Sequence, residues 1–132
     1  MVDVIQAAGY ECIGTDIQGG IDFLNCDAPG GIGAIITNPP FCIADKFIER
    51  CAKHGLPFAL LLKSQYFQAK KRIKLFLDYK PTYILPLTWR VDFMKKKRGG
   101  GSPTMDLIWV VWLPCNNNSY PQYIPLKKPK EN

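Results

Sequence analysis

Hydrophobic residues along the chain fall into alternating blocks of two kinds. Blocks of the first kind repeat every three or four positions, which is typical of one face of a helix, and they predict helices at 2–8, 43–54 and 68–79. Blocks of the second kind are continuous apolar runs, and they predict buried strands at 12–17, 32–37, 58–62, 83–87 and 107–113. Strands that alternate with helices form βαβ units, so we expect an α/β fold: a parallel sheet with helices on both faces, in three layers.

Glycine and proline mark where these elements end. Gly55 follows the second predicted helix, at the place where a helix usually stops. Pro39 and Pro40 end the second strand, because a proline cannot donate a hydrogen bond to a sheet. Asparagine, proline and lysine dominate residues 115–132, so we expect a domain of residues 1–114 and a C-terminal tail with little regular structure.

Composition limits the class of protein. The chain has 132 residues, of which 47% are hydrophobic, enough for one core. No apolar run approaches the roughly 20 residues that a membrane span needs, and the first residues lack the order of a signal peptide. We therefore expect a soluble, cytoplasmic protein without a membrane partner.

The cysteines form no CxxC pair, and their spacing to the single His54 does not fit a zinc site. They are Cys12, Cys26, Cys42, Cys51 and Cys115. We predict reduced and mostly buried thiols, with no metal and no disulfide. Cys42 is interpreted as a packing residue, because no base is evident near it.

The net charge of +6 is concentrated in three groups. They are Lys70, Lys71, Arg72 and Lys74; Lys95, Lys96, Lys97 and Arg98; and Lys127, Lys128 and Lys130. One interpretation of these groups is that they bind a phosphate-bearing partner. In the other interpretation, the first group is the solvated face of a helix and the third is a solubilising tail. The second group lies beside the run Gly99–Gly101 and is the candidate nucleic-acid contact.

The segment Asn38-Pro39-Pro40-Phe41 has a clear chemical use. The exocyclic amine of a base is a poor nucleophile, because its lone pair is delocalised into the ring. The side-chain carbonyl of Asn38 and the backbone carbonyl of Pro39 can both accept hydrogen bonds from that amine and free the lone pair. The prolines fix the loop, and Phe41 can stack on a base that has left its duplex.

These residues and their order resemble the S-adenosylmethionine-dependent amino-methyltransferases, in particular the small DNA adenine-N6 methyltransferases of phages and prophages. That family carries Asn or Asp before Pro-Pro and an aromatic residue at the end of a buried strand. The resemblance covers Val2 to Leu113 and implies a Rossmann-like class I methyltransferase sheet. It assigns the catalytic loop to Asn38, Pro39, Pro40 and Phe41.

The resemblance also implies a cofactor site. In the family, the acid that ends the preceding strand binds the ribose hydroxyls, which matches Asp16, followed by Ile17; a further acid and a large apolar residue bracket the cofactor's adenine, which matches Asp22 and Phe23. Asp16 as a simple loop cap is the alternative. The family fold opens with a strand and a glycine-rich turn, and the residues from Met1 onward match the segment after that turn. We therefore expect an N-terminally truncated domain whose binding of S-adenosylmethionine is weakened or lost.

The substrate is less narrowly defined than the reaction. Asn38 suits N6 of adenine, although similar motifs act on guanine amines in RNA and on glutamine side chains in proteins. The basic group Lys95–Arg98 favours DNA, and the stretch 87–93 with Trp89 is a candidate wedge for the target base. No segment is large enough for a separate target-recognition domain, so we expect little sequence specificity.

A second class of function is a non-catalytic binding protein with a methyltransferase fold. Such a protein binds nucleic acid or a protein partner, for example a component of a host defence system if the source is a phage. The missing first strand favours this alternative, because it leaves a sheet edge for a partner strand or a second copy. A third explanation is a gene whose start was assigned too late.

Overall fold

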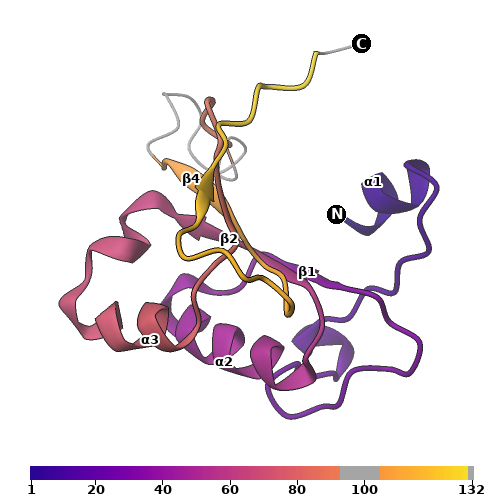
Figure 1. Ribbon diagram of the computed structural model, residues 1–132. Helices are drawn as coiled ribbons and strands as arrows, with labels where there is room; N and C mark the ends of the chain where they lie inside the picture. The colour runs from indigo at the N-terminus through magenta and orange to yellow at the C-terminus, as the bar shows by residue number, and fades with distance from the viewer. Residues whose placement is uncertain (93–104, 131–132) are drawn as a thin grey trace. The chain divides into compact units, whose positions relative to one another are not determined.

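The computed structural model describes residues 1–92 and 105–130 (Figure 1). The chain forms two compact units, residues 1–30 and residues 31–132, called here the N-terminal and the C-terminal unit. The predicted domain of residues 1–114 therefore spans both units. Each unit is described by itself.

The N-terminal unit contains helix α1 (Val2–Ala7) and the 3-10 helix η1 (Ile17–Gly19). Helix α1 confirms the predicted first helix. The predicted strand at 12–17 is wrong, because these residues form no strand and the chain turns at Asp16. The carbonyl of Asp16 accepts hydrogen bonds from the amides of Gly19 (2.9 Å) and Ile21 (3.3 Å), so the backbone bonds to itself where a strand would bond to a neighbour.

The C-terminal unit contains all the strands that the structure describes. They are β1 (Ile35–Thr37), β2 (Phe58–Lys63), β3 (Tyr83–Pro86), β4 (Leu107–Trp112) and β5 (Gln122–Tyr123). Its helices are η2 (Phe41–Ile43), α2 (Ala44–His54), η3 (Ser64–Gln68), η4 (Lys70–Arg72) and α3 (Ile73–Asp78). Four of the five strands that the apolar runs predict are thus confirmed, and Gly55 ends α2 in the left-handed conformation with φ +66°.

The strands form one mixed sheet in the order β1-β2-β4-β3-β5. Strands β1 and β2 are parallel, and so are β3 and β5, whereas β4 runs antiparallel to both β2 and β3. The α/β fold is confirmed, but the expectation of an all-parallel sheet is wrong. Helices connect β1 to β2 and β2 to β3, while the described residues between β3 and β4 form none. Neighbouring antiparallel strands, such as β3 and β4, need no crossover helix between them.

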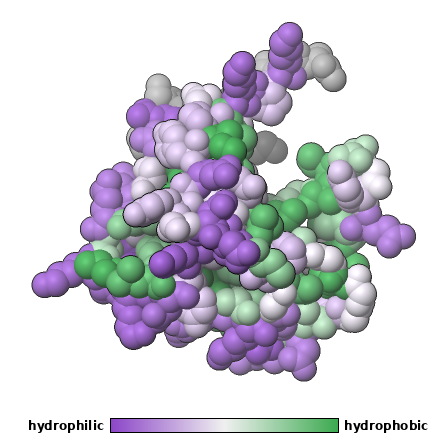
Figure 2. Space-filling model, viewed as in Figure 1, coloured by the Kyte–Doolittle hydropathy of each residue, from purple (hydrophilic) through white to green (hydrophobic). Residues whose placement is uncertain are grey.

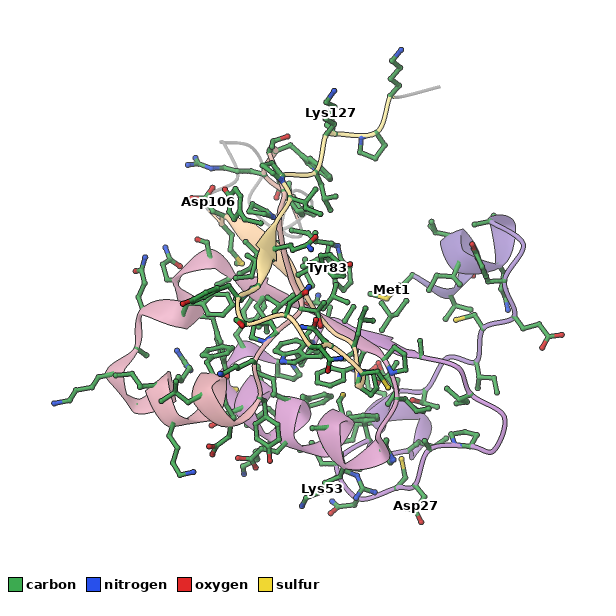
Figure 3. All side chains as sticks on the ribbon, viewed as in Figure 1. Met1, Asp27, Lys53, Tyr83, Asp106 and Lys127 are labelled. Carbon is green, nitrogen blue, oxygen red and sulfur yellow. The ribbon has the colours of Figure 1, made fainter. Side chains whose placement is uncertain are left out.

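The core of this unit lies between the sheet and α2, where side chains fill the space (Figure 3). Helix α2 buries Ala44, Ile48 and Cys51 completely. The sheet side of the core consists of the buried residues Phe58, Leu60, Leu62, Ile108, Val110 and Trp112. The rings of Phe58 and Trp112 stack with their centroids 4.6 Å apart.

Helices α2 and α3 lie on the same face of the sheet (Figure 1). The expected three-layer arrangement needs helices on the other face as well. No α-helix within the described residues of the C-terminal unit covers that face.

The predicted helix at 68–79 is shorter and less buried than its periodicity indicates. Ala69 is extended, with φ −90° and ψ 120°, and it separates η3 from η4, so only α3 is α-helical. Ile73 and Leu77 are 58% and 64% exposed, which contradicts their predicted burial. Phe76 alone of the predicted apolar face packs inward, with its ring centroid 4.4 Å from that of Phe67.

Part of the C-terminal tail joins the sheet, which its composition did not predict. Strand β5 pairs with β3, and Leu126 forms a bridge to Leu87. The pairing rests on backbone groups: the amide of Gln122 donates to the carbonyl of Thr82 at 2.9 Å. An edge strand of this kind needs no apolar side chains, so a polar composition does not exclude it.

Candidate active site at the edge of the sheet

The candidate catalytic loop, Asn38–Phe41, begins directly after β1. Strands β1 and β2 are parallel, with Thr37 opposite Leu60, so both carboxyl ends point to the same edge of the sheet. Strand β2 continues beyond Leu60 to Lys63. The loop and the end of β2 therefore share the edge where open α/β sheets bind ligands.

The loop fixes its own backbone and leaves Asn38 available. Pro39 is buried, and the carbonyl of Pro40 accepts a hydrogen bond from the amide of Ile43 at 3.1 Å, which starts the turn into α2. Asn38 is exposed, and its side-chain amide bonds to none of the residues in 1–92 and 105–130. The arrangement offers a free carbonyl acceptor on a restrained backbone.

Phe41, the aromatic residue of the loop, lies beside Lys63. The Lys63 Nζ atom is 5.1 Å from the centroid of the Phe41 ring and lies over its face, within the range of a cation–π contact. Both residues are half-buried. Sequence analysis did not single out Lys63, because a lysine at the end of an apolar run indicates only the exposed end of a strand.

The described residues on either side of segment 93–104 also lie at this edge. The amide of Leu87, just past β3, donates to the carbonyl of Leu107 at the start of β4, at 3.0 Å. The carboxylate of Asp106 pairs with Arg90 Nε at 2.8 Å, and the Asp106 carbonyl accepts from the amide of Ser64 at 3.0 Å. The predicted nucleic-acid contacts themselves lie outside the described residues: Lys95, Lys96, Lys97 and Arg98.

The predicted cofactor residues all belong to the N-terminal unit, where both acids stabilise turns. Asp16 Oδ1 accepts a hydrogen bond from the amide of Gln18 at 2.8 Å and caps η1, the alternative role considered for it. Asp22 uses both carboxylate oxygens within its own turn, for the amide of Leu24 at 3.0 Å and the side chain of Asn25 at 2.5 Å.

The two acids therefore differ in how many carboxylate acceptor positions remain for hydrogen bonds from ribose hydroxyls. Asp16 is exposed, and its second carboxylate oxygen can still accept a bond from a hydroxyl group. The hydrogen bonds of Asp22 leave it fewer acceptor positions. Ile17 is 70% exposed and begins η1, and Phe23 is half-buried.

Tyr66, in the segment after β2, is a buried polar residue that sequence analysis missed. It is 4% exposed, and its hydroxyl has no hydrogen-bond partner in the part of the chain that the structure describes. The Arg72 guanidinium lies 3.7 Å from the ring centroid and donates to the Tyr66 carbonyl at 3.2 Å. Burial raises the pKa of Tyr66, and the positive charge of Arg72 partly offsets this. No periodic pattern links two residues six positions apart in irregular structure.

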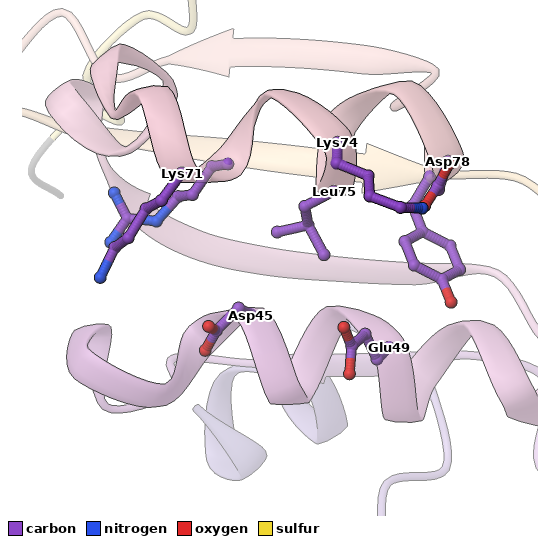
Figure 4. Close-up of a pocket in the computed structure, with 8 residues that line it drawn as sticks. Asp45, Glu49, Lys71, Lys74, Leu75 and Asp78 are labelled. Carbon is purple, nitrogen blue, oxygen red and sulfur yellow. The ribbon is translucent and has the colours of Figure 1, made fainter.

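A cavity of about 280 Å³ separates α2 from the segment of η4 and α3 (Figure 4). Acidic side chains from α2, Asp45 and Glu49, face the basic segment with Lys71, and Lys74 pairs with Asp78. The surface on this side of the unit is mixed: hydrophilic side chains surround a hydrophobic patch (Figure 2), and Ile73 and Leu77 of α3 are exposed. The candidate catalytic loop does not line this cavity, so the two are separate features of the C-terminal unit.

The thiols are less buried than predicted. Cys42 and Cys115 are exposed, so Cys42 is not the packing residue that we expected; Cys12 and Cys26 are half-buried. Only Cys51 is buried, and burial raises the pKa of its thiol to about 12. Within residues 1–92 and 105–130, no three metal-binding side chains gather in one place, and no helix is long and apolar enough to cross a membrane.

The sequence matches no protein-family model and no curated protein.

Proposed function

We propose that this chain is an amino-methyltransferase-like protein with a Rossmann-like class I sheet, related to the enzymes that methylate N6 of adenine in DNA with S-adenosylmethionine. The observation that carries the proposal is the position of Asn38–Phe41. The loop follows a parallel strand at the ligand-binding edge of the sheet, and the Asn38 amide is exposed and bonds to no described residue.

The residues of the loop act by positioning. The carbonyl groups of Asn38 and Pro39 accept hydrogen bonds from the two amine hydrogens of the base, which frees the nitrogen lone pair. The buried Pro39 restrains the backbone that carries both acceptors, and the Phe41 ring supports the plane of the base. S-adenosylmethionine supplies the electrophilic methyl group, and the reaction needs no covalent intermediate with the protein.

The sheet is compatible with this proposal. Strands β1, β2 and β3 run in one direction, with helices between consecutive strands, and β4 is the reversed strand between β2 and β3. The three parallel strands therefore bring their carboxyl ends to one edge. Open α/β sheets bind ligands at such an edge.

For the cofactor, the residues present support weak binding. Asp16 is the candidate for the ribose hydroxyls, since it keeps an available oxygen, and Ile17 follows it. Asp22 and Phe23 are the candidates beside the cofactor's adenine, although Asp22 already accepts bonds within its own turn. We therefore propose that S-adenosylmethionine binds with reduced affinity.

DNA is the proposed substrate because the sequence carries the basic group Lys95–Arg98. The basic residues Lys95–Arg98 lie between Arg90 and Asp106 in the sequence, and those two residues are at the carboxyl edge. Basic segments of this kind contact phosphates without reading bases.

The second candidate is a binding protein with the same fold and no catalysis. It is favoured by the edge strand β1, which pairs with β2 on one side and with no described strand on the other. Ile36 in this strand is 47% exposed. A strand of a protein partner, or of a second copy in a homodimer, could pair with this edge.

Calorimetric titration of S-adenosylmethionine into the full chain separates the two candidates. The methyltransferase proposal predicts saturable binding that Asp16→Ala abolishes. Asp3→Ala is the matched control, since it removes an exposed acid from α1 in the same unit and should leave binding unchanged. A wild-type chain that shows no binding even at high cofactor concentration would favour the non-catalytic candidate.

A further inference from the structure

Lys63 is a cation at the catalytic loop with no acidic partner among the described residues. Its Nζ atom lies 5.1 Å from the Phe41 ring centroid, and it forms an ion pair with none of the carboxylates in 1–92 and 105–130. Arg90 and Asp106, which also lie at this edge, neutralise each other at 2.8 Å. The ammonium group of Lys63 therefore adds a positive charge beside the loop that no described carboxylate compensates.

The position of this charge indicates the group that it binds. Lys63 Nζ lies over one face of the Phe41 ring, so in this proposal the base stacks on the other face. A base in a nucleic-acid strand brings its sugar and two phosphates to the rim of the ring that supports it. A flexible lysine side chain at that ring can reach such a phosphate.

We propose that Lys63 binds a backbone phosphate of the nucleotide whose base stacks on Phe41. The inference rests on the proposed function and deepens it, because it names the substrate class of the loop. A base within a polyanionic strand offers a partner to Lys63, whereas the glutamine side chain of a protein does not. Lys63 is thus a specificity residue that favours nucleic acid.

The test is a double-mutant cycle on single-stranded DNA binding, measured by fluorescence anisotropy at low salt. The first probe is a labelled single-stranded thymidine oligonucleotide with one central adenine. The second probe has the same sequence, but neutral methylphosphonates replace the phosphates on both sides of that adenine. The protein variants are Lys63→Met, which keeps the length of the side chain, and Lys53→Met. Lys53 is an exposed lysine in the last turn of α2, so it serves as the matched control.

We expect Lys63→Met to weaken binding of the natural oligonucleotide about fivefold, as for an exposed charge pair. The slope of log K against log salt should become less steep by about 0.7, one phosphate contact on a single strand. On the methylphosphonate oligonucleotide Lys63→Met should have no effect, and Lys53→Met should have none on either. Equal losses on both oligonucleotides, no loss on either, or no DNA binding by the wild-type chain would overturn the proposal.

The proposed function is tested separately, by comparing the affinity of the wild-type chain for oligonucleotides with and without the central adenine. If replacement of the central adenine by thymine leaves the affinity unchanged, the loop does not select adenine and the proposed function fails, whatever Lys63→Met does. If adenine is preferred but the cycle shows no coupling, only the role of Lys63 is rejected.

Discussion

The thiol of Cys51 is predicted to be chemically silent in the folded chain. Its side chain is fully buried on the inner face of α2, and burial raises its pKa from 9.0 to about 12. At pH 8 the fraction of thiolate therefore falls from about one tenth to about one in ten thousand, since each pKa unit is a factor of ten. Because the thiolate is the reactive form, a thiol reagent should modify Cys51 in the folded protein about a thousandfold more slowly than an ordinary thiol.

Ellman's reagent at pH 8 measures this directly, with Cys51→Ala as the comparison. Both proteins should give the same rapid phase, from exposed thiols such as Cys42 and Cys115. Wild type should give one further equivalent, on a slow phase or after addition of denaturant, and Cys51→Ala should lack it. If Cys51→Ala loses one equivalent from the rapid phase instead, the burial of α2 against the sheet is wrong.

The same burial fixes the sign of a pH dependence. The folded state favours the neutral thiol, so the contribution of Cys51 to stability is fully present below pH 9.0 and is lost as the pH rises toward about 12. In this window the free energy of unfolding should fall with a slope of up to about 1.4 kcal/mol per pH unit from this group. Cys51→Ala should show a correspondingly shallower slope in urea titrations, and identical slopes would contradict the assignment.

Two further predictions concern polar side chains of the C-terminal unit, and urea unfolding tests both. Tyr66→Phe removes a buried hydroxyl without a described partner, so stability should stay the same or rise by about 1 kcal/mol, and a clear loss would reveal a bond that the structure does not show. Asn38→Ala removes an exposed amide that bonds to no described residue, so stability should change by less than about 0.5 kcal/mol; a larger loss would mean that Asn38 holds the loop together.

The sequence pattern correctly predicted those elements whose own residues carry the signal. The continuous run at Phe58–Leu62 forms an inner strand of the sheet, paired on both sides, with β1 and with β4. Helix α2 follows its apolar periodicity because one face packs on that strand, and Gly55 ends it as expected. The loop at Asn38 was found for a similar reason: two prolines after an apolar run end a strand wherever they occur.

Strand direction could have been predicted and was not. The sequence shows helical periodicity before β2 and before β3, but only a polar segment before β4. A connection without a helix favours an antiparallel neighbour, so the reversed β4 follows from this pattern. We did not predict the reversed β4, because we assumed that all strands of the sheet are parallel.

Other features depend on contacts that a linear pattern does not contain. The apolar run at 12–17 looks like β2, but it forms no strand, because a strand requires a neighbour to pair with. The contact between Lys63 and Phe41 arises only when two parallel strands end together. Tyr66 and Arg72 meet through irregular structure, where no spacing rule applies.

Methyl transfer to adenine tests the central claim most directly. The full chain is incubated with S-adenosylmethionine and adenine-containing single-stranded DNA, and the digested product is analysed for N6-methyldeoxyadenosine by mass spectrometry. We predict that wild type forms this nucleoside and that Asn38→Ala, folded to the same extent, forms none. Equal product from Asn38→Ala would show that the loop after β1 is not the catalytic site, and no product from a wild-type chain that binds both ligands would contradict the proposed reaction.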